Sequence, residues 1–286
     1  HGEIVAMDRS IGSLRAGLRE LDIADDTLVW FTSDNGGSAN IDTGVAYPNG
    51  TNSPAVVEYP SDCSFDIDPN LTSEESVALG CIRGAKPDST GHLRGFKKDF
   101  YEGGLRVPTV IEWPSGIGPR VSNFPSATYD IFPTLIDVAF LDPKSINEIH
   151  DGISLADVFV SEPPRRNKPL GFRASDGRMW MDNDWKLVQN VSFTKEGFIT
   201  QPFELYNVIG DPSEEQNLIE LYPDLAARMA NELAKWSISV SRSALGEDYP
   251  EKIVLPTGRN FDPIVDERSR RRIAEWQSEV KLGAGD

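Results

Sequence analysis

The side chains best suited to chemistry follow a short apolar run. Residues 27–32 (Thr-Leu-Val-Trp-Phe-Thr) are rich in β-formers, a pattern typical of a strand buried on both faces of a parallel sheet. Asp34 and Asn35 come next, at the kind of strand end where ligands bind in open α/β sheets. The glycines at 36–37 permit a turn that lets both side chains converge. A carboxylate beside an amide oxygen suits Ca²⁺ or Mg²⁺. The alternative is an ordinary turn, for which this sequence is also well suited.

A second stretch, residues 92–108, concentrates positive charge in an otherwise acidic chain. Its basic side chains are Arg94, Lys97, Lys98 and Arg106. Glycines at 95, 103 and 104 let the backbone turn tightly or approach a ligand. A lysine ammonium suits an oxyanion with no fixed orientation. The stretch is therefore a candidate anion site, and His92 at its start is a candidate for substrate contact. The alternative is a solvated, charged surface loop.

The composition excludes some classes of protein. The 286 residues include 28 Lys+Arg and 45 Asp+Glu, and the net charge of −17 argues against a nucleic-acid binder. An anionic substrate would have to be attracted by a local basic cluster. Hydrophobic residues make up 39% of the chain, enough for a core, and no run of about 18 apolar residues predicts a membrane span.

The two cysteines and the first residue leave further points open. Cys63 and Cys81 lack the C-x-x-C spacing of metal sites, and they could form one disulfide or remain reduced. The chain begins with His1 in residues that already read as the middle of a helix. We therefore expect the true start of the protein to lie upstream.

The elements that position these residues can be read from periodicity and turn signals. In chain order, the pattern predicts a helix at 2–21, strands at 27–33 and 107–113, a helix at 129–139, short strands at 170–174, 179–181, 185–188 and 204–207, and helices at 222–240 and 265–280. Residues 38–90 are polar and aperiodic, which predicts a long surface insertion. A linker at 161–169 suggests two domains, 1–162 and 163–286, the second a smaller α+β subdomain with a helical tail.

The ordered set of motifs resembles the type I sulfatases, the formylglycine-dependent, arylsulfatase-like enzymes of the alkaline phosphatase superfamily. The central motifs are residues 28–36 and 93–108 with Trp-Pro at 113–114. Later landmarks follow in the same order: Asp-Ile-Phe-Pro-Thr at 130–134, Asp-Gly at 151–152, Trp-Lys-Leu at 185–187, Glu-Leu-Tyr at 204–206, Asp-Pro at 211–212 and Asn-Leu at 217–218. The resemblance covers roughly residues 1–240. It implies an α/β fold, with a mixed or parallel sheet sandwiched by helices and then a smaller antiparallel sheet packed with a helix.

The resemblance also implies roles for individual residues. Asp34 and Asn35 match two ligands of the active-site Ca²⁺, with Mg²⁺ as the other hard cation to consider. Lys97, four residues before Tyr101 in the family pattern, matches the lysine that contacts a sulfate oxygen. Relatives that act on phosphates or phosphonates usually carry Asp-His where this chain has Asp-Asn, so sulfate esters are favoured. His92 has no counterpart in the family pattern, and a surface loop histidine is the alternative.

One departure from the family is large. Type I sulfatases carry an early Cys-x-Pro-x-Arg or Cys-x-Ala-x-Arg motif, whose cysteine becomes the formylglycine nucleophile, and two further aspartate ligands. Neither Cys63 nor Cys81 has this context. The chain therefore resembles the carboxyl-terminal part of a sulfatase, with formylglycine expected in a missing amino-terminal part. On this basis we expect the chain alone to be inactive and poorly stable.

The leading hypothesis is thus a sulfuric ester hydrolase fragment. Its parent would hydrolyse sulfate monoesters of a carbohydrate or aryl compound by calcium-assisted formylglycine chemistry, in a periplasmic, secreted or lysosome-like location. The partners implied are a sulfated small molecule or glycan and the missing part of the same protein, with no nucleic acid and no membrane span. The alternatives are a non-catalytic relative that binds metal or sulfated glycan, and a phosphoester or phosphonate hydrolase of the same superfamily.

Overall fold

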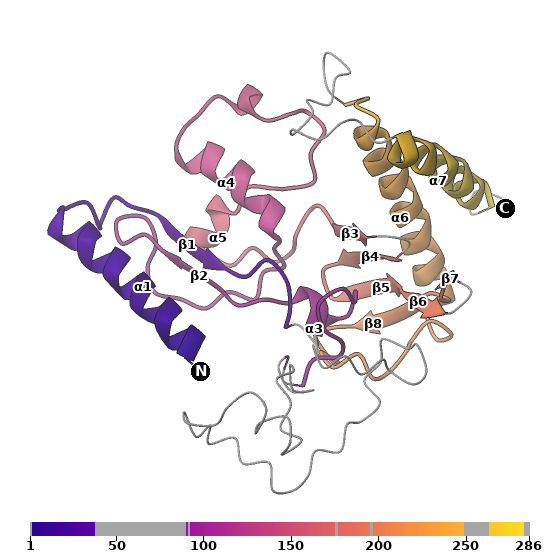
Figure 1. Cartoon of the computed structure of the whole chain (residues 1–286), viewed down its shortest axis with the longest axis horizontal. Helices are drawn as coiled ribbons and strands as arrows, with labels where there is room; N and C mark the ends of the chain where they lie inside the picture. The colour runs from indigo at the N-terminus through magenta and orange to yellow at the C-terminus, as the bar shows by residue number, and fades with distance from the viewer. Residues whose placement is uncertain are drawn as a thin grey trace, which may run out of the picture. The chain divides into compact units, whose positions relative to one another are not determined.

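The structure, a computed structural model, describes residues 2–37, 90, 92–174, 177–194, 197–248 and 263–282 (Figure 1). Cys63 and Cys81 lie outside these residues, as does the predicted insertion apart from Thr90. The chain forms two compact units. The first contains the described residues up to Asp34 together with 107–168, and the second contains those of 35–106 and of the chain from Pro169 onward.

The first unit contains a helix and a two-stranded sheet. Helix α1 spans Gly2–Glu20, β1 spans Val29–Thr32 and β2 spans Thr109–Glu112, close to the predicted positions. Strand β1 pairs antiparallel with β2, with Thr32 opposite Thr109. The α1 side chain Arg15 contacts the β2 residue Glu112 through two N–O pairs of 2.6 and 2.8 Å. Helix and sheet are therefore tied by a bidentate charge pair at the end of β2.

The pairing of β1 differs from the local sequence expectation. The apolar run predicted a parallel neighbour and burial on both faces, whereas β2 is antiparallel and every residue of β1 is only half-buried among the described residues. The physical reason is that an apolar pattern reports how much of a strand can be buried but not the direction of its neighbour. The α/β class itself is confirmed by the structure, which contains both helices and sheets.

A buried ion pair organises the rest of the first unit. The short helix η1 (Thr128–Asp130) leads into α4 (Ile131–Val138), and η2 (Pro143–Ser145) and α5 (Ala156–Val160) follow. Asp130 is fully buried and accepts two hydrogen bonds of 2.8 Å from the Arg166 guanidinium. Its carboxylate also accepts from the backbone N–H groups of Ala127 and Ile153, each at 2.8 Å. One carboxylate therefore fixes three segments that are distant in sequence.

The second unit is built on a four-stranded antiparallel sheet in the order β3-β4-β5-β8. These strands span Leu170–Ala174, Gly177–Asp182, Trp185–Gln189 and Glu204–Asn207, and they confirm the short strands predicted from the sequence. A separate hairpin of β6 (Val191–Thr194) and β7 (Gly197–Thr200) was not predicted.

The two faces of this sheet pack against different elements. Helix α6 (Pro223–Ala244) supplies Met229 and Leu233, which form one buried cluster with Leu187 and Leu205. The neighbouring strand residues belong to a second buried cluster, made of Phe100, Met179, Val188, Tyr206 and Val208. Because side chains alternate along a strand, the two clusters lie on opposite faces. The segment around Phe100, with the short helix α3 (Glu102–Leu105), therefore covers the face opposite α6.

These contacts explain how the compact units differ from the predicted ranges. Residues 92–106 fall within the predicted domain 1–162, yet they pack in the second unit because Phe100 joins its buried cluster. The boundary in the chain near Lys168 lies close to the predicted linker. The functional division into a catalytic domain and a smaller subdomain stays a prediction.

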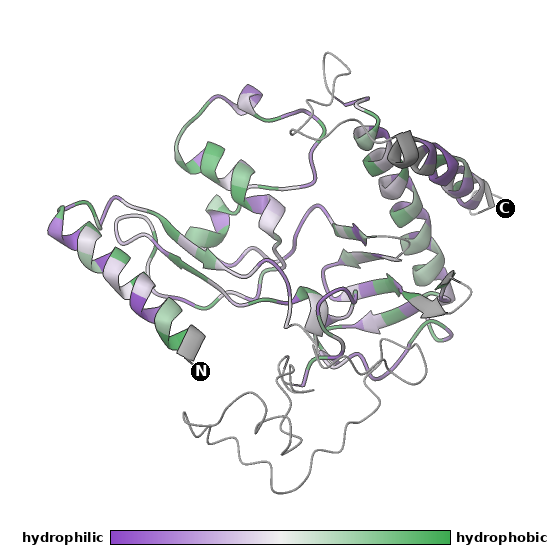
Figure 2. Ribbon diagram, in the orientation of Figure 1, coloured by the Kyte–Doolittle hydropathy of each residue, from purple (hydrophilic) through white to green (hydrophobic). Residues whose placement is uncertain are grey.

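A last helix, α7 (Pro263–Leu282), packs with α6, and Figure 2 colours most of it as hydrophilic. Within the described residues no helix is both long and apolar enough to span a bilayer.

The Asp130–Arg166 pair gives the first testable prediction. Replacing Arg166 with methionine leaves a fully buried carboxylate without its cation, and breaking a buried pair in this way costs about 3–5 kcal/mol. We expect faster hydrogen exchange throughout the first unit, including at the Ile153 amide. The matched control is Arg165→Met, the same substitution at an exposed neighbour. Equal exchange in the two variants would contradict the assigned role.

Candidate functional site

The chain turns sharply just after β1. Thr32 ends the strand, where its hydroxyl lies 2.9 Å from that of Thr109 on β2. Asp34 is exposed and is the last residue of the first unit, whereas Asn35 is half-buried and begins the second. The chain bends at residues 34–36, which overlap the predicted turn at Gly36 and Gly37.

Backbone hydrogen bonds tie this turn to the basic loop, defined here as residues 92–106. The Gly36 N–H donates to the Gly104 carbonyl at 2.9 Å, and the Lys97 N–H donates to the Gly37 carbonyl at 2.8 Å. The segment that follows Asn35 is therefore bonded to both limbs of the loop. The structure thus brings together the Asn35 and Lys97 segments that the sequence placed about 60 residues apart.

Glycines make this close approach possible. A Cβ atom added to Gly36 would lie 1.9 Å from the Gly103 carbonyl oxygen, and one added to Gly103 would lie 2.2 Å from the Gly95 carbonyl oxygen. Both distances are far below a van der Waals contact, so no side chain fits without moving backbone. The glycines are therefore required for packing between the turn and the loop.

The two lysines at the tip of the basic loop both project into solvent. Lys97 and Lys98 are exposed, and Lys98 has a left-handed backbone with φ of 89°. The loop is closed beneath them by the Asp99 carboxylate, which accepts from the Phe96 N–H at 3.1 Å, and burial raises the pKa of Asp99. Because both lysines are exposed, solvent exposure does not show which of them contacts the sulfate, and the assignment to Lys97 stays a prediction. His92 is exposed in the turn before them, and its role also stays a prediction.

The other two basic side chains of the loop have structural partners. The Arg94 guanidinium donates to the Tyr206 hydroxyl at 2.7 Å and to the Glu214 carbonyl at 3.0 Å, and it lies 3.8 Å from the centre of the Tyr101 ring. Arg106 lies 3.9 Å from the Glu102 carboxylate. Of the four basic residues that the sequence grouped together, these two anchor the loop, and the lysines remain as the candidate anion ligands.

The aromatic partners of Arg94 stay protonated. Burial is the main cause that raises the pKa of Tyr101, and its hydroxyl donates a short hydrogen bond to the Glu204 carboxylate. Burial likewise raises the pKa of Tyr206 to about 12. Neither phenol is therefore suited to act as a base near neutral pH.

A buried ion-pair triad, formed by Glu102, Lys186 and Glu214, lies beneath the loop. The Lys186 ammonium has no solvent exposure, and it contacts the Glu102 carboxylate at 2.8 Å and the Glu214 carboxylate at 2.9 Å. Glu214 also accepts from the Glu102 N–H at 2.6 Å, and it has a left-handed backbone with φ of 54°. Burial raises the pKa of Glu214, against the opposing charge of Lys186. The triad joins α3, β5 and the turn before α6.

Glu102 and Lys186 lie within motifs of the family resemblance, but the sequence assigned no role to either residue or to Glu214. One signal was present: Lys186 interrupts an otherwise apolar strand between Trp185 and Leu187. A lysine in the middle of a buried strand needs an acidic partner. The identity of that partner could not be read, because Glu102 lies 84 residues earlier in the chain.

The residues present fit a hard cation only in part. Asp34 offers a carboxylate and Asn35 an amide oxygen, both suitable donors for Ca²⁺, which takes six to eight oxygen ligands. Within the described part of the chain, no group of three or more His, Cys, Asp or Glu side chains is arranged to hold a metal. The assignment of Asp34 and Asn35 as metal ligands therefore stays a prediction, and it requires further donors from elsewhere.

Comparisons with known proteins show that the chain is similar to sulfatases. Residues 2–140 match the family model described as Sulfatase. A sulfatase of Formosa agariphila is 32% identical over 172 residues, which cover 53% of this chain and 30% of that protein. Human steryl-sulfatase is 28% identical over 199 residues, which cover 69% of this chain and 27% of that protein. The chain therefore spans less than a third of either relative.

A solved structure shows the same fold. The crystal structure of Ps i-CgsB in complex with k-i-k-neocarrahexaose matches with a TM-score of 0.58 at 19% sequence identity. The match covers 96% of this chain and 48% of that one. At this level of identity the likeness carries the fold and not the substrate.

The buried ion-pair triad gives the second prediction. Lys186→Met removes the only cation of the triad and leaves two buried carboxylates that repel each other. We expect hydrogen exchange at the amides of Lys97 and Gly103 to rise roughly tenfold or more, because α3 loses its anchor. The matched control is Lys235→Met, at an exposed position of α6.

A variant that removes all three charges of the triad distinguishes the effect of the Lys186 charge from the effect of its packing. In the triple variant Lys186→Met, Glu102→Gln, Glu214→Gln, no buried charge is left unpaired, and exchange at Lys97 should return toward its original rate. If the triple variant exchanges as fast as the single one, the loop depends on the shape of Lys186 and not on its charge.

Proposed function

We propose that this chain, which belongs to the sulfatase family, provides part of the active site of an enzyme that hydrolyses sulfate monoesters. The observation that carries the proposal is the pair of hydrogen bonds joining the turn at Gly36–Gly37 to the basic loop. They link the segment of a candidate metal ligand to the segment of a candidate sulfate ligand. A shared substrate needs these two kinds of group near one another.

Each residue has a distinct role in this proposal. Lys97 binds a sulfate oxygen through its ammonium and so offsets the charge of the transferred group. Asp34 and Asn35 supply two oxygen ligands to Ca²⁺, or to Mg²⁺ as the alternative hard cation. The cation, when bound, polarises the sulfate and stabilises negative charge on it. The buried triad and Arg94 hold the loop in place, so that Lys97 is positioned before substrate arrives.

The proposal places the nucleophile outside these 286 residues. Formylglycine would come from a Cys-x-[Pro/Ala]-x-Arg motif, and the contexts of Cys63 and Cys81 do not match it. The chain alone would accordingly be inactive. Its partner would be the remaining part of the same protein, which supplies the nucleophile and further metal ligands.

Exposed apolar side chains in the first unit support such a partner. Ile4, Leu14 and Leu21 on or beside α1 are 53–70% exposed, and Val110 on β2 is 61% exposed. Figure 2 shows the apolar residues of α1 as green segments between hydrophilic ones. Exposed apolar surface on this scale marks a region that another polypeptide covers. We propose that the remaining part of the enzyme packs here and completes the sheet that begins with β1 and β2.

The substrate class follows from the relatives, as a proposal. One curated relative is named a steryl-sulfatase, and another is named an N-acetylgalactosamine-6-O-sulfatase. We propose a sulfated carbohydrate or an aryl sulfate as the substrate of this enzyme. Such an enzyme would act in the periplasm, outside the cell or in a lysosome-like compartment.

The third prediction tests the sulfate ligand. In the enzyme with its complete active site, Lys97→Ala should lower kcat/KM for an aryl sulfate by roughly 100-fold or more, since one preorganised charge contact is lost. Lys98→Ala removes the charge of the adjacent exposed lysine and should change kcat/KM little. A larger loss at Lys98 than at Lys97 would refute the assignment.

The fourth prediction tests the metal ligands. Calorimetry on the same enzyme should show that Asp34→Ala abolishes Ca²⁺ binding, because a carboxylate ligand and its charge are removed together. Asp26→Ala, at an exposed aspartate before β1, is the matched control and should bind normally. Unchanged Ca²⁺ affinity in the Asp34 variant would remove this residue from the site.

A further inference from the structure

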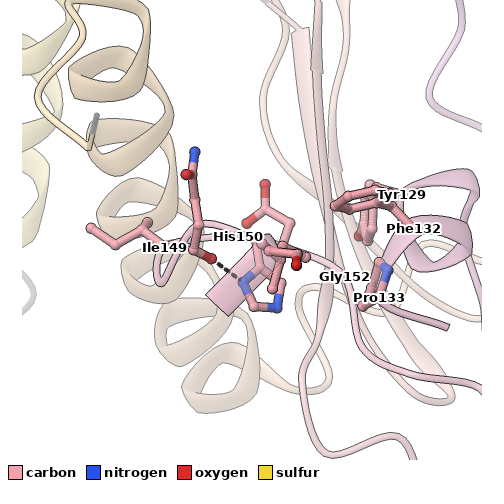
Figure 3. A pocket seen from close by; sticks show the side chains of 10 residues that line it. Tyr129, Phe132, Pro133, Ile149, His150 and Gly152 are labelled. Carbon is pink, nitrogen blue, oxygen red and sulfur yellow. Dashed lines mark hydrogen bonds between the residues drawn. The ribbon is translucent and has the colours of Figure 1, made fainter. Parts of the chain in front are cut away.

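A cavity of about 360 Å³ opens in the first unit, apart from the residues assigned to catalysis. Figure 3 shows Tyr129, Phe132 and Pro133 on one side of it and Ile149 and His150 on the other. The first group comes from η1 and the start of α4, and the second comes from the segment after η2. The volume lies in the range of pockets that hold small organic ligands.

Hydrogen bonds and a close backbone contact at its base hold the walls of this cavity in place. Asp130, between Tyr129 and the start of α4, accepts a hydrogen bond of 2.8 Å from the Ile153 N–H and so holds the second wall against the first. The Lys168 ammonium donates to the His150 carbonyl. A Cβ atom added to Gly152 would lie 2.2 Å from the Tyr129 carbonyl oxygen, so the walls meet closely at the base. The cavity is therefore formed in advance of any ligand.

The polar side chains of the cavity offer several hydrogen-bond acceptors, and the Asn147 amide adds donor N–H groups. His150 Nδ1 lies 2.7 Å from the Asn147 carbonyl oxygen, which can only accept, so Nδ1 carries the hydrogen (Figure 3). In the neutral ring, Nε2 is then an acceptor. The Asp151 carboxylate accepts, and the Ser145 hydroxyl can do either. Such a set suits a ligand that presents several hydroxyl donors.

Charge and apolar surface narrow the ligand class further. Among the described residues that line the cavity there is no lysine or arginine that would attract a sulfate group. Phe132 is 52% exposed, and Pro133 and Ile149 add apolar surface beside it. A neutral sugar ring combines an apolar C–H face with hydroxyl groups at its edge, which matches both properties of the lining.

We propose that this cavity binds a neutral sugar unit of a glycan. The inference rests on the proposed function only in its choice of a glycan, since a carbohydrate sulfatase meets unsulfated units next to the ester it hydrolyses. An organic cation held by Phe132 and Asp151 is the competing ligand, because aromatic faces and a carboxylate also attract quaternary ammonium groups. The number of neutral hydrogen-bonding side chains favours the sugar.

The test is methyl NMR on the enzyme with its complete active site, with labelled isoleucines. Ile146 and Ile149 line the cavity, whereas Ile111 on β2 and Ile219 in the second unit do not. Neutral trisaccharides of glucose, galactose and N-acetylgalactosamine are titrated separately, followed by tetramethylammonium. We expect at least one trisaccharide to shift the Ile146 and Ile149 signals alone, with a Kd of about 1 mM.

Variants then test the stacking surface. Phe132→Ala should weaken trisaccharide binding roughly two- to tenfold, because an aromatic contact is lost. Phe140→Ala is the matched control, a 95% exposed phenylalanine just beyond α4 that does not line the cavity, and it should bind as before. Equal loss of binding in both variants would overturn the assignment.

The remaining outcomes are equally decisive. Shifts with tetramethylammonium but with no trisaccharide would replace the sugar by an organic cation, and no shift with any probe would overturn the site. Because binding is measured without hydrolysis, its failure leaves the proposed function standing. Conversely, an enzyme that binds the sugar but does not hydrolyse sulfate esters would overturn the function and keep the site.

Discussion

The second unit depends on one buried cation. Lys186 is the second residue of β5 and has no solvent exposure, and a buried ammonium is very costly unless acidic groups surround it. Glu102 and Glu214 meet that need, one from α3 and one from the turn before α6. Because a buried ion pair tolerates little change in geometry, the three segments cannot shift independently. The position of the basic loop is therefore set from inside the unit.

Within the basic loop, the residues that anchor the backbone differ from those proposed to bind the substrate. Arg94, Tyr101 and Glu102 point inward, where they contact Tyr206, Glu204 and Lys186 respectively. Lys97 and Lys98, at the tip between them, remain exposed. The inward residues hold the backbone through side chains, and the glycines hold it against the turn after β1 through close backbone contact. A flexible lysine is thus presented from a rigid base, which reduces the entropy lost when it binds an anion.

Sequence reasoning located elements better than partners. The strand at Val29–Thr32 and the helix at Pro223–Ala244 follow from apolar periodicity, a local property of the chain. The antiparallel pairing of β1 with β2 could not be read, because register and direction depend on contacts between distant segments. The triad was missed for the same reason: a charged residue shows that it needs a partner, but not which one. A turn at Gly36–Gly37 was predicted from local chemistry alone, and the chain bends at the adjoining residues 34–36.

The overall charge of the chain limits which positively charged groups can attract an anionic substrate to the proposed site. A chain with a net charge of −17 repels an anionic substrate at long range, so attraction must come from charges close to the bound group. Arg94 and Arg106 each lie 3.9 Å from a carboxylate, that of Glu204 and that of Glu102 respectively, and this opposing charge reduces their contribution to the local field. This leaves the exposed lysines, together with any cation held by Asp34 and Asn35. Salt screens the distant repulsion over about 8–10 Å, whereas a contact at hydrogen-bond distance is screened much less. The proposed site would therefore capture its substrate by short-range contacts.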